Sequence, residues 1–125
     1  MAITVTTFTQ VIEEKSSAVY TVTVKDNNGT AIGSGSMDAL TLTLVNRADD
    51  TVLNSRTDQN ILNANNVTVS GLGVIAFTLQ AADTAMVDPL REFETHRATF
   101  KLTYGTTNTR NWAVDFNIHN LKQVT

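Results

Sequence analysis

The sequence predicts an all-β protein built as a two-sheet antiparallel sandwich, and three observations carry this prediction. Apolar and polar residues alternate with a period of two over most of the chain, which is typical of strands with one buried face. Turn residues separate these runs roughly every ten residues. No long segment has the period of an amphipathic helix. Only 17% of the residues are charged, and threonine and asparagine supply many of the other polar residues. Threonine favours strands and asparagine favours turns.

Length and composition limit the class of protein. The 125 residues are enough for one domain with its own core. The chain has no cysteine, which excludes disulfides and thiolate metal sites and fits folding in a reducing compartment. The formal net charge is −3 and the cations are scattered, so we expect no nucleic-acid partner. The N-terminus lacks the pattern of a signal peptide and no apolar run reaches membrane-spanning length, so we expect no membrane partner.

Residues 1–17 are predicted to be either an N-terminal arm or the first edge strand. Alternation is weak here, and the segment is rich in apolar residues, namely Ile3, Val5, Phe8, Val11 and Ile12. Because an unpaired strand edge accepts a strand from another chain, such an arm can also join a neighbouring subunit.

The middle of the chain alternates in short runs separated by turns. The predicted strands are residues 18–25, 39–46, 51–54, 67–70 and 74–79. Residues 26–29, read DNNG, predict a tight turn because Asn-Gly tolerates positive φ. The Gly/Ser-rich residues 30–38 predict a loop that crosses between the sheets.

Two segments interrupt the alternation. Residues 55–66 are polar and Asn-rich, and we expect a long loop anchored by Ile61 and Leu62. In residues 80–87 the alanines favour a single helical turn that Asp83 would cap. The spacing of Leu79, Asp83 and Ala85 also resembles the corner between strands E and F of immunoglobulin-type sandwiches.

The longest alternating stretch, residues 97–119, predicts a central antiparallel hairpin. Aligning its apolar faces gives three cross-strand pairs: Phe100 with Phe116, Leu102 with Val114 and, on the solvent face, Lys101 with Asp115. Trp112 is expected to be buried. Together these segments predict an immunoglobulin-like antiparallel β-sandwich of seven or eight strands over residues 18–121, with residues 122–125 as a tail.

Candidate catalytic and metal-binding residues are few. His96 and His119 are expected near each other, with only Glu94 and Asn120 close by, which is too small a ligand set for zinc, so we expect two solvated histidines. The acidic residues 49, 50 and 58 are expected in solvated turns. No carboxylate lies inside an apolar run, and no nucleophile or phosphate-binding motif is present. We therefore expect no enzyme, no metal and no cofactor.

Four segments carry a resemblance to a known family. They read YTVTVKDNNGTAI, ALTLTLVNRADDTVLNSRTDQNILNANNVTV, GVIAFTLQAADTAMVD and ETHRATFKLTYGTTNTRNWAVDFNI. The chain from Phe8 to Leu121 resembles small immunoglobulin-like virion proteins of tailed bacteriophages, above all in the loop with Asp58, Asn60 and Asn63. The resemblance implies a structural virion component: a capsid decoration or cement protein, a neck accessory or a baseplate module. It carries no catalytic motif, so it transfers no functional residue.

We therefore expect a non-enzymatic virion structural protein, a capsid decoration protein that binds the major capsid lattice and copies of itself after assembly in the bacterial host cytoplasm. The predicted partner-binding residues lie in the N-terminal segment and the long loop, namely Ile3, Val5, Phe8, Val11, Ile12, Asp58, Asn60, Ile61, Leu62 and Asn63. The alternatives are a neck, tail or baseplate accessory and a host-surface glycan-binding module. A glycan site needs exposed aromatic side chains, and only Phe93 is not assigned to the core face.

Overall fold

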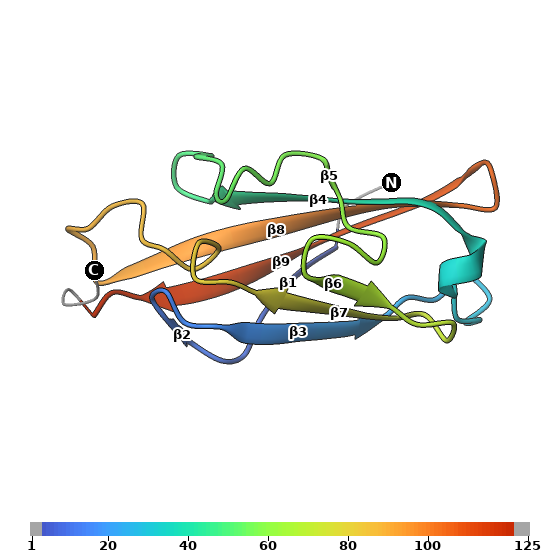
Figure 1. Cartoon of the computed structure of the whole chain (residues 1–125), viewed down its shortest axis with the longest axis horizontal. Coiled ribbons are helices and arrows are strands. Elements are labelled where there is room, and N and C mark those ends of the chain that lie inside the picture. The colour runs from blue at the N-terminus through green and yellow to red at the C-terminus, as the bar shows by residue number, and fades with distance from the viewer. Residues whose placement is uncertain (1–3, 122–125) are drawn as a thin grey trace.

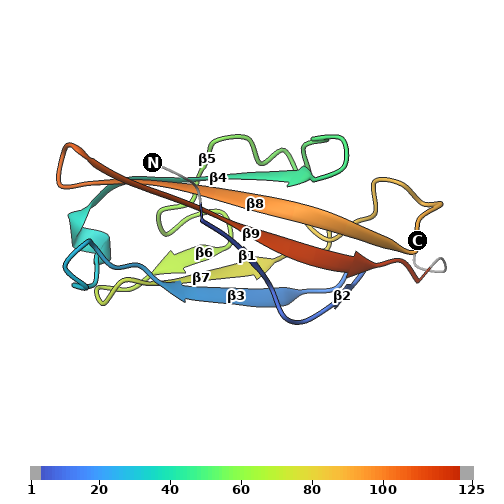
Figure 2. The ribbon, with the colours of Figure 1, turned by 180° about the vertical axis from the view of Figure 1, so that it is seen from behind.

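The computed structural model describes residues 4–121, with side chains from residue 6 onward, as two β-sheets that form a sandwich (Figures 1 and 2). The predicted all-β class is confirmed. The large sheet has the order β1–β9–β8–β4–β5, and β2 also pairs with β9; the small sheet has the order β3–β7–β6. Within these residues no helix has the length and apolar character to cross a membrane.

The strands of the large sheet are β1 (Thr4–Thr7), β2 (Ile12–Glu13), β4 (Met37–Asn46), β5 (Gln59–Asn60), β8 (Phe93–Tyr104) and β9 (Asn108–His119). Those of the small sheet are β3 (Ala18–Thr23), β6 (Val67–Val69) and β7 (Val74–Leu79), and a 3-10 turn, η1 (Ser34–Ser36), precedes β4. The 12-residue strands β8 and β9 form the longest pair, which crosses the whole molecule in Figure 1.

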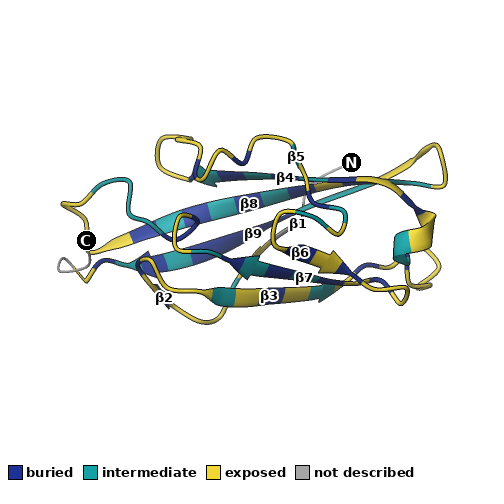
Figure 3. Ribbon diagram, viewed as in Figure 1, coloured by how far each residue is buried: buried dark blue, intermediate teal, exposed yellow. Residues whose placement is uncertain are grey.

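The core lies between the two sheets, and buried residues alternate with less buried ones along the longer strands (Figure 3). Leucines at 40, 42 and 44 on β4 and the residues at 75, 77 and 79 on β7 belong to one hydrophobic core, and all six side chains are fully buried, as the period of two predicts. The predicted turn at residues 26–29 is also confirmed: Asp26 Oδ1 accepts the N–H groups of Asn28 (2.8 Å) and Thr30 (3.0 Å), and Gly29 has φ +79°.

The predicted register of the central hairpin is wrong. Each β8 residue faces a β9 residue four positions earlier than expected, so Phe100 lies opposite Trp112 and Leu102 opposite Arg110. A shift by an even number keeps the same residues inward, so the alternation alone cannot distinguish the two registers. The position of the turn selects the register. The chain reverses over residues 105–107, with φ +57° at Gly105 and +67° at Thr106.

The corrected register changes the neighbour of Asp115. This carboxylate does not face Lys101 on the solvent side; it is buried opposite Arg97, whose Nε donates to Oδ1 (2.7 Å) and whose Nη2 donates to Oδ2 (3.1 Å). Hydrogen bonding to this carboxylate raises the pKa of the Arg97 guanidinium. Arg47 Nη1 adds a longer contact at 3.4 Å. The bidentate pair therefore fixes the register that hydrophobic alternation leaves open.

Three further expectations differ from the structure. Residues 51–54 form no strand and contribute only an isolated bridge between Val52 and Val45. Residues 80–87 contain turns rather than a helix. Trp112 is half-buried rather than fully buried, because it lies at the open side of the sandwich with its ring stacked on Phe100 at 5.0 Å and 9°.

The N-terminal segment lies along β9 of its own chain. Both β1 and β2 pair with β9 in parallel, and the N–H of Phe8 donates to the Asp115 carbonyl (2.8 Å) between them. The Phe8 ring packs 5.2 Å from Phe116, and Ile12 is buried. Ile3 and the side chain of Val5 lie outside the described part of the chain.

Candidate functional site

The 55–66 loop lies along the outer edge of β4. Its short strand β5 pairs with β4, and the N–H of Ile61 donates to the Leu40 carbonyl at 2.9 Å. Ile61 is fully buried and Leu62 is partly buried against the core, so both act as the predicted anchor. The polar residues at 58, 60 and 63 are exposed. Of the five predicted contact residues of this loop, these three polar ones present their side chains to solvent.

A buried ion pair, which the sequence analysis missed, holds this loop. Arg56 is only 1% exposed, and its Nε and Nη2 donate to the two carboxylate oxygens of Asp83 at 2.6 and 3.1 Å. Asp83 is also buried; instead of capping a helix, it accepts the N–H of Gln80 (2.7 Å) and an Asn54 amide N–H (3.0 Å). The side-chain carboxylate of Asp83 therefore joins residues 54–56 to the β7–β8 connection.

The remaining donors of Arg56 organise the loop itself. Nη1 donates to Gln59 Oε1 (2.7 Å) and the Asn65 carbonyl (3.0 Å), and Nη2 donates to Asn66 Oδ1 (3.1 Å). With the two bonds to Asp83, all five guanidinium N–H groups are used. The guanidinium carbon also lies 5.1 Å from the Phe77 ring centroid, within cation–π range. The loop is thus a preorganised surface rather than a flexible connection.

A second buried polar cluster ties the 80–92 connection to the start of β8. The Glu94 carboxylate accepts the N–H groups of Val87 (2.8 Å) and Asp88 (2.9 Å). His96 Nε2 lies 2.6 Å from Glu94 Oε1, and Nδ1 lies 3.0 Å from the Asp83 carbonyl. The expectation that His96 is solvated is wrong, because residue 96 lies opposite Phe116 on the inner face.

The two histidines lie on opposite faces of the large sheet. His119 is half-buried on the outer face, stacked on Phe93 at 4.7 Å, with Nδ1 3.0 Å from Glu13 Oε2. They therefore do not form the pair expected from the sequence. Among residues 4–121 no group of three or more His, Cys, Asp or Glu side chains is arranged to hold a metal ion.

Carboxylates are buried although none lies inside an apolar run of sequence. They are Glu14, Asp83, Glu94 and Asp115, and each has hydrogen-bond donors. Because these donors come from distant segments, a local pattern could not reveal this burial. Glu14 accepts the N–H of Leu121 (2.9 Å), and all four carboxylates link loops or strands.

Exposed apolar side chains gather at the end of the sandwich where β8 begins and β9 ends. We call Val11, Leu90, Phe93 and Leu121 the end patch; they are 47%, 88%, 53% and 42% exposed. Backbone contacts hold their segments together: Asn120 N–H donates to the Glu92 carbonyl (2.7 Å), and the Asn120 side chain donates to the carbonyls of residues 89 and 91. Of the predicted N-terminal contact residues, Val11 belongs to this patch.

Comparison of the chain with protein-family models, curated proteins and solved structures finds no match.

Proposed function

We propose that this protein is a non-enzymatic structural component of a bacteriophage virion, a capsid decoration protein that binds the major capsid lattice. The end patch carries the proposal. The end patch places four large apolar side chains at one end of a small sandwich, and one of them, Val11, belongs to the predicted contact segment. Exposed apolar side chains gathered in one region of a surface mark contact sites between proteins.

The order of the strands supports an immunoglobulin-type assignment. The small sheet runs β3–β7–β6 and the large sheet contains β9–β8–β4–β5. In chain order this corresponds to the B–E–D and G–F–C–C′ sheets of a variable-type immunoglobulin domain. This order agrees with the family that the sequence resembles.

The exposed polar face of the 55–66 loop supplies a second contact surface. Asp58, Asn60 and Asn63 offer hydrogen-bonding groups in a loop that Arg56 holds in one conformation, so little conformational entropy is lost on binding. Weak contacts at each copy suffice on a capsid, because neighbouring copies gain from multivalency.

The test compares two exposed leucines at opposite ends of the sandwich. Leu90 lies in the end patch, whereas Leu72, 77% exposed, lies in the β6–β7 turn at the other end (Figure 1). The variants Leu90→Ser and Leu72→Ser are added to phage particles that lack the protein, and bound protein is measured after sedimentation. We expect Leu90→Ser to reduce attachment and Leu72→Ser to attach like the wild type.

Equal attachment of the two variants would contradict the role of the end patch. Labelling of the attached wild-type protein in electron micrographs tests the location: labels spread over the capsid support decoration, and labels confined to the neck or the baseplate support the alternative accessory role.

A further inference from the structure

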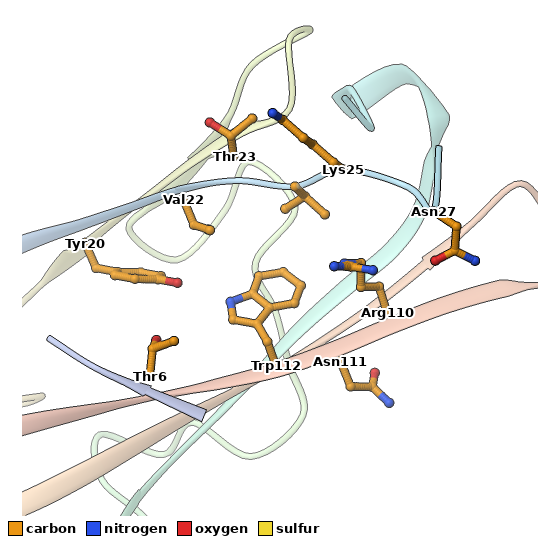
Figure 4. A pocket seen from close by; sticks show the side chains of 10 residues that line it. Thr6, Tyr20, Val22, Thr23, Lys25, Asn27, Arg110, Asn111 and Trp112 are labelled. Atoms are coloured by element: carbon orange, nitrogen blue, oxygen red, sulfur yellow. The ribbon is translucent and has the colours of Figure 1, made fainter. Parts of the chain in front are cut away.

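A groove runs along the open side of the sandwich, between β3 of the small sheet and the first half of β9 (Figure 4). Its volume is about 590 Å³, within the range of sites that bind ligands. Tyr20 and Val22 of β3 form one wall, and Arg110, Asn111 and Trp112 of β9 form the other. The groove lies away from both the end patch and the 55–66 loop.

The β3 wall of the groove is a free strand edge. Among the described residues β3 pairs with β7 alone. The N–H of Val24, directly after β3, donates to the Gly73 carbonyl on the β7 side at 2.9 Å. Since main-chain groups of successive residues point to opposite sides, those of residues 19, 21 and 23 point away from β7. These groups can pair with one more strand.

The groove carries a cation and a polar atom without a partner of good geometry. Its described lining includes Lys25 and Arg110 and no acidic residue, and neither cation forms an ion pair within the described part of the chain. Arg110 and Trp112 point into the groove, whereas Lys25 and Asn111 point away from them (Figure 4). The buried Nε1 atom of Trp112 makes no hydrogen bond of good geometry, although its interaction with the Tyr20 hydroxyl offsets part of the rise in the pKa of that group. This indole N–H can therefore still donate to a bound group.

We propose that this groove binds an extended peptide segment of a partner protein that carries a carboxylate side chain, added as a strand to the free edge of β3. The peptide backbone pairs with residues 19–23. Its alternate side chains enter the gap between the sheets, where the carboxylate meets Arg110 and the Trp112 indole N–H gains an acceptor.

This inference deepens the proposed function and rests on it for one point, that the partner is another virion protein. The site itself follows from the strand edge, the unpaired Arg110 and the Trp112 indole N–H. It differs from the end patch in chemistry, because it recognises main-chain groups and a negative charge rather than an apolar surface.

Panning a displayed library of random twelve-residue peptides against the whole protein tests the inference. We expect enriched peptides to combine Asp or Glu with strand-favouring residues. Binding of a synthetic enriched peptide should weaken at least about tenfold in Arg110→Gln, because the peptide carboxylate loses its partner. The control is Lys101→Gln, which removes an exposed strand cation that does not line the groove and should leave binding unchanged.

Amide and indole resonances of the ¹⁵N-labelled protein locate the bound peptide. We expect shifts at residues 19, 21 and 23 and at the Trp112 indole. Four results would each overturn the inference. The enriched peptides could lack acidic residues, or an enriched peptide could bind Arg110→Gln as tightly as the wild type. The shifts could be confined to the end patch, or panning could enrich no peptide while a heparin hexasaccharide occupies the groove.

The outcomes separate this inference from the proposed function. Normal attachment of the wild type to particles without peptide binding overturns the groove alone. Groove-dependent peptide binding by a protein that does not attach to particles overturns the virion role alone.

Discussion

Removing either partner of the buried Arg56–Asp83 pair should cost more stability than any surface substitution. In Asp83→Ala the Arg56 guanidinium stays buried, and two of its five donors lose their acceptor. In Arg56→Met the buried carboxylate loses its charge partner, while the loop loses three further bonds. Breaking a buried pair in this way costs about 3–5 kcal/mol. For a domain of about 5–15 kcal/mol total stability, this is a large share.

The matched control is Arg91→Met. Arg91 also pairs with an aspartate, Asp88, at 3.3 Å, but the two side chains are 62% and 42% exposed. Exposed pairs contribute about 0–1 kcal/mol, so the same substitution should have little effect there. The free energy of unfolding is measured by urea titration with Trp112 fluorescence as the probe.

The double variant Arg56→Met/Asp83→Ala distinguishes an ion pair from two independent packing losses. Since it leaves neither charge buried without its partner, we expect its cost to fall below the sum of the single costs by about 1–3 kcal/mol. Single costs equal to that of Arg91→Met, or strictly additive costs, would refute the reasoning.

Three other predictions concern stability. Burial raises the pKa of Tyr20 above its ordinary value of 10.0, and the nearby Trp112 indole offsets part of the rise. As pH rises past about 10, the unfolded chain releases the Tyr20 proton before the folded chain does, so the free energy of unfolding falls. In urea titrations at pH 9–11, Tyr20→Phe should therefore show a smaller decrease of the free energy of unfolding with pH than the wild type. Gly33→Ala should lower the melting temperature in circular dichroism, because the new Cβ would lie 2.2 Å from the Gly71 carbonyl oxygen; an unchanged value would contradict this close approach. Arg97→Leu should lower the free energy of unfolding in urea by about 2–3 kcal/mol, because the buried Asp115 carboxylate loses its bidentate partner. A decrease below about 0.5 kcal/mol would contradict that role.

The strands were predictable because hydrophobic alternation reports directly on burial. The inward leucines of β4, the β6–β7 hairpin and the turn at residues 26–29 all follow from local sequence. The register of β8 and β9 does not, since any even shift preserves the alternation. It depends on the turn at residues 105–107 and on the Arg97–Asp115 pair.

The polar interior was not predictable from local pattern. Arg56 lies in an Asn-rich segment that reads as a solvated loop, and its partner Asp83 lies in a segment that reads as a helix cap. His96 differs, because the period of two places it on the same face as Ala98 and Phe100, and only its position near the end of the predicted strand suggested solvent exposure. For Arg56 and Asp83 burial results from contacts between segments distant in the sequence, which composition and period do not encode.

The N-terminal segment is part of the fold of the domain. Removing residues 2–12 would take Phe8 and Ile12 from the core and expose the edge of β9. We therefore expect this truncation to destabilise the domain. Substitution of the exposed Val11 by Ser therefore tests the contact role of this segment without that loss.

The proposed virion role is tested most directly by quantitative mass spectrometry of gradient-purified particles of a phage whose genome encodes this sequence. The account predicts that the protein copurifies with the particles in many copies, at a fixed ratio to the major capsid protein. Particles that contain none of it would contradict the proposal, and particles with only a few copies would contradict its placement on the capsid lattice.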